Sequence, residues 1–243
     1  MVVMFVAFLV VVAVMVSASI SDFRTREILD YHWIVIGAVG ITVALLTYDL
    51  LPGALLAAGY GMFMLFMFSG RVEGKVSGIV IVTGSALLIA SSYVSESLFP
   101  MATLAMTLLF LAMYFLKMMK GGADVKALVV LSFVFPAYPE FGTLIWEAVY
   151  PSGYVFNPIF SSFAIAVVLS TVYAIAVNYR RSGGERISSY VTTREDAEGS
   201  FVWKLQEVDG DHVRVTPMIP FLVPLTAGLL ITVVLGSPFF LLI

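Results

Sequence analysis

Long apolar runs alternate with short polar segments along most of this chain of 243 residues. A run of about 17 to 25 apolar residues is long enough to cross the hydrocarbon core of a bilayer as a helix. The run over 124–138 is the shortest, at about 22 Å if helical, and could continue past Pro136 and Pro139 as a kinked helix. The pattern predicts eight transmembrane helices, over about 2–20, 33–48, 53–69, 76–92, 101–116, 124–138, 158–178 and 217–236.

One polar segment, 179–216, interrupts this pattern near the C-terminus. Residues 201–208 and 212–215 read as strands, and Asp209-Gly210 between them is a hairpin turn signal. An isolated hairpin is marginally stable, so we expect it to pack against the helix ends. The predicted organisation is seven helices in 1–178, a β-containing insert in 179–216, and a C-terminal helix in 217–243.

Composition narrows the class of protein. Hydrophobic residues make up 60% of the chain and charged residues only 12%, about half the charged share of a soluble domain. We therefore expect an all-α polytopic membrane protein whose surroundings are the lipid bilayer. The absence of cysteine and the presence of only two histidines argue against a disulfide scaffold, a cysteine nucleophile and a metal site. No cofactor is implied, and a net charge of −3 gives no sign of nucleic-acid binding.

Basic residues predict the orientation of the helices. With the N-terminus outside, all 13 Lys and Arg residues fall in the four inside segments, 21–32, 70–75, 117–126 and 179–216. This agrees with the enrichment of Lys and Arg in cytoplasmic loops. The first apolar run lacks a preceding basic region, so we interpret it as a retained helix and not a cleaved signal peptide. The insert would then be cytoplasmic, and the membrane the plasma membrane.

Two aspartates at the predicted cytoplasmic helix ends are the candidates for chemistry. Asp22 follows the first apolar run, and Asp124 opens the sixth after Gly121 and Gly122. Two close carboxyl groups share one proton, so one can activate water while the other donates a proton to a carbonyl oxygen. Each aspartate also has a purely structural interpretation. Asp124 could stabilise a helix N-terminus, and Asp22 could pair with a neighbouring arginine.

Three motifs in this order resemble the archaeal preflagellin and prepilin peptidases, which are membrane aspartyl proteases of the GxGD class. The first resembles the family's Asp-x-Arg-x-Arg-x-Ile pattern, and the second its GxGD-x-Lys pattern. The third resembles a Thr-Pro-x-Ile-Pro-x-x-x-Pro pattern that enters the last helix. In this sequence they read Asp22-Phe23-Arg24-Thr25-Arg26-Glu27-Ile28, Gly121-Gly122-Ala123-Asp124-Val125-Lys126 and Thr216-Pro217-Met218-Ile219-Pro220-Phe221-Leu222-Val223-Pro224.

The resemblance implies that Asp22 and Asp124 form a catalytic pair at the cytoplasmic face. Its substrates would be prepilins or prearchaellins, in which a short basic leader precedes a hydrophobic helix. Lys126 matches the family lysine and would tune Asp124, contact substrate, or simply anchor the helix at the interface. Arg24 and Arg26 match the family pattern, but we favour a topological role for both as positive-inside residues.

The sequence departs from the family pattern in three respects. Ala123 replaces the second glycine of GxGD, which would cause strain if that residue needs a positive φ. The two aspartates are 102 residues apart, which suggests an extra helix pair between the motifs. Bacterial relatives typically carry a four-cysteine zinc element and N-methylate the product. Without cysteine, no methyltransferase activity is expected here.

Three alternatives remain open. A protease of the presenilin or signal-peptide-peptidase type would share the two aspartates but cut inside the substrate helix. A non-catalytic membrane scaffold that binds pilins would explain Ala123. A transporter would place ionisable residues along a path through the bilayer, whereas the middles of the predicted spans carry no charge.

Overall fold

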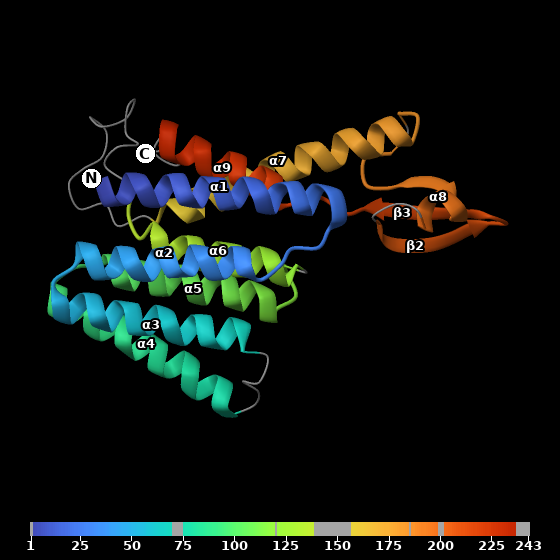
Figure 1. The fold of residues 1–243 in the computed structure, drawn as a ribbon. Coiled ribbons are helices and arrows are strands. Elements are labelled where there is room, and N and C mark those ends of the chain that lie inside the picture. Colours follow the sequence, from blue (N-terminus) through green and yellow to red (C-terminus); the bar gives the residue numbers. More distant parts are fainter. Residues whose placement is uncertain are drawn as a thin grey trace.

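The computed structural model describes residues 2–69, 75–119, 121–138, 157–184, 186–198 and 202–236. Helices dominate this part of the chain, and a small sheet follows the seventh helix (Figure 1). The helices are α1 Val2–Thr25, α2 Tyr31–Thr47, α3 Leu50–Phe68, α4 Lys75–Ser95, α5 Phe99–Phe115, α6 Gly122–Val134, α7 Pro158–Arg181, the short α8 Arg194–Glu198, and α9 Leu222–Leu235.

Each predicted apolar run coincides with a helix, and together the helices describe a membrane-embedded protein. Four of them, α1, α3, α4 and α7, are long and apolar enough to cross a bilayer. The apolar helices α2, α5 and α9 are shorter, with 17, 17 and 14 residues. The full count of eight transmembrane spans therefore stays a prediction.

Helix α6 forms the centre of the bundle. Its 13 residues extend about 20 Å, and every residue from Ala127 to Val134 is buried. A helix that is apolar on all sides is stable only when other helices surround it, and α2, α5 and α7 pack against α6. Within the described residues, α6 ends at Val134, before Pro136, so the kinked continuation to 138 does not form. Residues 139–156 lie outside the described part.

The helices that carry the two aspartates come together through α2. Helix α1 packs mainly against α2 and α9, and α7 packs along α9. Helix α6 also packs against α2, so α1 and α6 share this neighbour instead of pairing mainly with each other. The C-terminal end of α1 and the N-terminal end of α6 lie at the end of the bundle from which the sheet projects (Figure 1).

The insert contains the predicted hairpin. Strands β2 (Val202–Asp209) and β3 (His212–Pro217) are antiparallel, and the turn between them has Gly210 at φ 53°. A further strand, β1 (Tyr190–Thr193), which the sequence did not reveal, makes the order β1-β3-β2. The sheet has its own small core of Tyr190, Ala197, Val213 and Val215. Asn178 in α7 donates to the Ile187 carbonyl oxygen at 2.9 Å, which connects the segment before β1 to the end of α7.

Candidate functional site

Asp22 lies inside a helix and not in the loop where the sequence placed it. Helix α1 runs to Thr25, beyond the predicted end at residue 20. The side chain is buried, with 7% of the residue exposed, and Oδ2 accepts a hydrogen bond of 3.0 Å from the Leu222 backbone N–H. Leu222 is the first residue of α9. The Asp22 carboxylate therefore meets the N-terminal end of a helix, where unpaired N–H groups and the helix dipole favour negative charge.

Polar side chains between α1 and α9 hold Asp22 against that helix end. Ser19, one turn before Asp22, donates to the Leu222 carbonyl oxygen at 3.0 Å and lies 2.8 Å from the Thr226 hydroxyl. All three side chains are buried. This contact was not predicted from the sequence, although a serine one turn before Asp22 at the end of an apolar run indicates a polar contact there.

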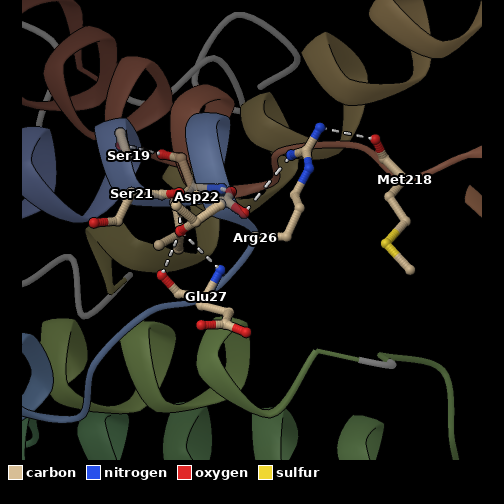
Figure 2. Close-up of polar contacts among 8 residues, drawn as sticks. Ser19, Ser21, Asp22, Arg26, Glu27 and Met218 are labelled. Atoms are coloured by element: carbon tan, nitrogen blue, oxygen red, sulfur yellow. Dashed lines mark hydrogen bonds and ion pairs between the residues drawn. The ribbon is translucent and has the colours of Figure 1, made fainter. Parts of the chain in front are cut away.

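Arg26 contacts the other carboxylate oxygen of Asp22. It follows the last residue of α1 with a left-handed backbone, φ 58°, which ends the helix. Its guanidinium lies 3.7 Å from Asp22 Oδ1, and Nη2 donates to the Met218 carbonyl oxygen at 3.1 Å. Figure 2 shows Arg26 between Asp22 and Met218. The first and third motifs of the sequence are therefore in direct contact.

Arg24 occupies a different position from Arg26. Its side chain is exposed and lines one part of an apolar groove of about 560 Å³ between α1 and α9. The structure therefore separates two arginines that the sequence analysis treated alike. Arg26 has contacts inside the site, and the topological interpretation fits Arg24 better.

Asp124 lies in the first turn of α6, directly after the two glycines. Gly121 precedes the helix with an extended backbone (φ −82°, ψ 110°), and Gly122 is the first helical residue. The Asp124 carboxyl group folds back over Gly121, so a Cβ on Gly121 would lie 2.8 Å from the carboxyl carbon. A Cβ on Gly122 would meet no atom within 4 Å. Gly121 is thus needed for space at the carboxyl group, and Gly122 is not.

Ala123, the departure from the family pattern, fits its position. It is the second residue of α6 and is not among the residues with positive φ. The strain that a left-handed backbone would cause is therefore absent. Its methyl group packs against the main hydrophobic core.

The two aspartates come together at one end of the bundle. Asp22 is close enough to Asp124 for their charges to interact. No hydrogen bond joins the two carboxyl groups in the described structure. Asp22 has partners in Leu222 and Arg26, whereas no described residue donates a hydrogen bond to the Asp124 carboxyl group. The two carboxyl groups thus differ in their hydrogen-bond partners. Because they do not bond to each other, their oxygen atoms can contact a water molecule or a peptide carbonyl group.

Lys126 points away from Asp124. Its ammonium group lies 2.6 Å from Asp30 Oδ1 and 4.8 Å from the centre of the Phe68 ring. Asp30 precedes α2, and Phe68 is the last residue of α3. Asp30 was not predicted as a site residue, because a single aspartate between two apolar runs does not indicate a partner 96 positions away.

Within the described residues there is no group of three or more His, Cys, Asp or Glu side chains placed to hold a metal ion. No protein-family model matches the sequence, and no curated protein matches it.

Proposed function

We propose that this protein is a membrane-embedded aspartic endopeptidase whose catalytic pair is Asp22 and Asp124. In this proposal it removes the basic leader of prepilin-like or prearchaellin-like precursors at the cytoplasmic face of the plasma membrane. The observation that carries the proposal is the meeting of two interacting carboxyl groups, from α1 and α6, at one end of an apolar bundle. The three sequence motifs support the choice of substrate class.

The surroundings of the two carboxyl groups suggest different roles for them. Asp22 accepts from the start of α9 and lies beside Arg26, and both contacts stabilise a negative charge. In our proposal Asp22 is the base that takes a proton from the attacking water. Asp124 has no such partner among the described residues and lies near the charge of Asp22, which suits a carboxyl group that holds the shared proton.

The reaction then needs only these two groups and one water molecule. The water oxygen attacks the scissile carbonyl carbon as its proton passes to Asp22, and the Asp124 proton moves to the carbonyl oxygen. When the tetrahedral intermediate collapses, the C–N bond breaks and the leaving amine takes the proton from Asp22. A hydroxyl group of the intermediate returns its proton to Asp124, which restores the pair. The products are the leader with a new carboxylate and the mature protein with a new amino group.

A cleavage assay with purified protein in detergent or membranes tests the proposal. A precursor with a basic leader is mixed with the wild-type protein, with Asp22→Asn and with Asp124→Asn. Each variant should lose at least about a hundredfold in rate, since general acid and base catalysis contributes that much or more. Asp22→Asn should fold, because the Leu222 N–H can still donate to the asparagine side-chain oxygen. Asp124→Asn should fold because no described residue donates a hydrogen bond to the Asp124 carboxyl group.

Asp49→Asn is the matched control. Asp49 is also an aspartate beside a helix N-terminus, that of α3. The N-terminal end of α3 lies at the end of the bundle opposite the sheet (Figure 1). This variant should cut at the wild-type rate. Full activity in either catalytic variant would contradict the proposal. Cutting within the hydrophobic helix of the precursor would favour the presenilin-type alternative, and no cutting of several precursors by the wild type would favour the scaffold.

A further inference from the structure

The ion pair between Lys126 and Asp30 joins the elements that carry the two candidate catalytic aspartates. Lys126 is in the second turn of α6, two residues after Asp124. Asp30 ends the short connection that leads from α1, with its Asp22, into α2. The N–O distance is 2.6 Å, with 24% of the Lys126 side chain and 53% of the Asp30 side chain exposed. The pair therefore connects the start of α6 to the segment that follows Asp22.

Lys126 is in an unfavourable place for a helix lysine. The helix dipole stabilises a lysine in the last turn of a helix, and Lys126 is near the other end of α6, in its second turn. Residues two positions apart point to different sides of a helix, so Lys126 does not face Asp124. Its two contacts, the Asp30 carboxylate and the Phe68 ring, compensate for the unfavourable position.

Asp30 is equally unusual. It stands at the N-cap of α2, where aspartate commonly accepts a hydrogen bond from its own helix. The Asp30 side chain makes no such cap bond. Its backbone carbonyl oxygen accepts from Trp33 and Ile34 at 3.1 and 3.0 Å, while its carboxylate reaches across to Lys126. The side chain thus connects two helices and does not cap its own.

We propose that Lys126 and Asp30 are positioning residues that set the placement of Asp124 relative to Asp22. This inference rests on the proposed function, and it assigns Lys126 no contact with substrate. Without the pair, the first turn of α6 is held only by its packing, and the Asp124 carboxyl group can shift. A displacement of about 1 Å in a catalytic group can reduce a rate by up to a hundredfold.

The test is steady-state cleavage by Lys126→Met and Asp30→Asn. Asparagine keeps the shape and the capping ability of aspartate, so Asp30→Asn removes little besides the charge. Each variant should lower kcat about tenfold and change KM by less than twofold. The double variant should be no slower than the slower single variant, because either change breaks the same contact.

Charge reversal separates positioning from other roles. Lys126→Asp and Asp30→Lys alone should both be slow, and the variant that combines them should regain part of kcat. The matched controls are Lys117→Met and Glu27→Gln, two exposed residues near the same helix ends that belong to no ion pair given by the described structure. Both should keep the wild-type kcat.

A readout independent of activity is available because the chain has no cysteine. Spin labels at Leu29→Cys and Met118→Cys, exposed by 66% and 68%, report the distance between the segments that precede α2 and α6. The distance distribution should broaden in Lys126→Met and Asp30→Asn and stay unchanged in Glu27→Gln.

The outcomes distinguish the two proposals. A rise in KM with unchanged kcat would overturn positioning in favour of a substrate contact. Additive losses without rescue by the charge swap, or unchanged distances, would also overturn it. If the wild type cuts no precursor while the labels respond as expected, the proposed function fails and the structural link between α6 and the Asp30 segment stands.

Discussion

Gly121 and Gly122, the two glycines before Asp124, have different physical roles. Gly121 leaves room for the Asp124 carboxyl group, which lies directly over it, while Gly122 faces open space. Neither glycine has a positive φ, so backbone freedom does not explain their presence. What constrains Gly121 is the close approach of the catalytic candidate itself.

Gly121→Ala should therefore impair activity without unfolding the protein. The new methyl group would displace the end of a side chain and no backbone, so we expect the free energy of unfolding to change by less than about 1 kcal/mol. We expect a loss of cleavage of tenfold or more from the shifted carboxyl group. Gly122→Ala, measured in the same assay, should have a much smaller effect, and equal losses in both variants would contradict this account.

At the scale of helices, α6 is positioned by a close approach to α2. A Cβ on Gly40 would lie 2.7 Å from the Phe133 Cβ and 3.1 Å from the Phe133 carbonyl carbon. A backbone atom cannot rotate out of the way as the end of a side chain can. The separation of α2 and α6, and hence the depth of Asp124 in the bundle, depends on the missing side chain at position 40.

Gly40→Ala should destabilise the bundle by about 1 to 3 kcal/mol, the usual cost of adding volume to a well-packed core. Gly61→Ala in α3 is the control, because a Cβ there meets no atom within 4 Å. The control should be neutral or slightly stabilising, since alanine favours helix over glycine by up to about 1 kcal/mol. Thermal unfolding in detergent compares the two, and similar melting temperatures would argue against a tight α2–α6 contact.

Apolar runs predicted where the helices are, but not all of their ends. The end of α1 was predicted before Asp22 because the hydrophobic run stops there, yet tertiary contacts with α9 carry the helix on to Thr25. The last helix was predicted from residue 217, but β3 extends to Pro217. Pro220 has no N–H to donate, and α9 begins only at Leu222. Both errors fall where the site is built.

For the whole molecule, the two candidate aspartates could be selected from the sequence, but the contacts that surround them could not. Asp22 and Asp124 stood out because they are acidic residues at the ends of apolar runs, within recognisable motifs. The contacts of Ser19 with Thr226 and of Lys126 with Asp30 join residues 207 and 96 positions apart. Such contacts depend on how the helices pack, and no local pattern in the sequence encodes them.

The orientation of the whole bundle decides whether the site can meet a cytoplasmic leader. Glu27, near the candidate site, is exposed, and Tyr93, near the C-terminal end of α4, is 86% exposed. Because the chain lacks cysteine, Glu27→Cys and Tyr93→Cys each introduce a single reactive thiol. All the basic residues lie on the predicted inside, so a membrane-impermeant maleimide should label Tyr93→Cys in intact cells. It should label Glu27→Cys only after the cells are permeabilised.

The reverse labelling pattern would place both aspartates outside the cell. Leaders on the cytoplasmic side could then not reach them, and the proposed substrates would be excluded even if the pair were catalytic. The eight-span arrangement places three crossings, 33–48, 53–69 and 76–92, between Glu27 and Tyr93. Labelling of both thiols from one side would mean an even number of crossings between them and would contradict that arrangement. Only the expected pattern, with Glu27 inside and Tyr93 outside, joins the charge distribution, the position of the site and the proposed cleavage reaction in one consistent topology.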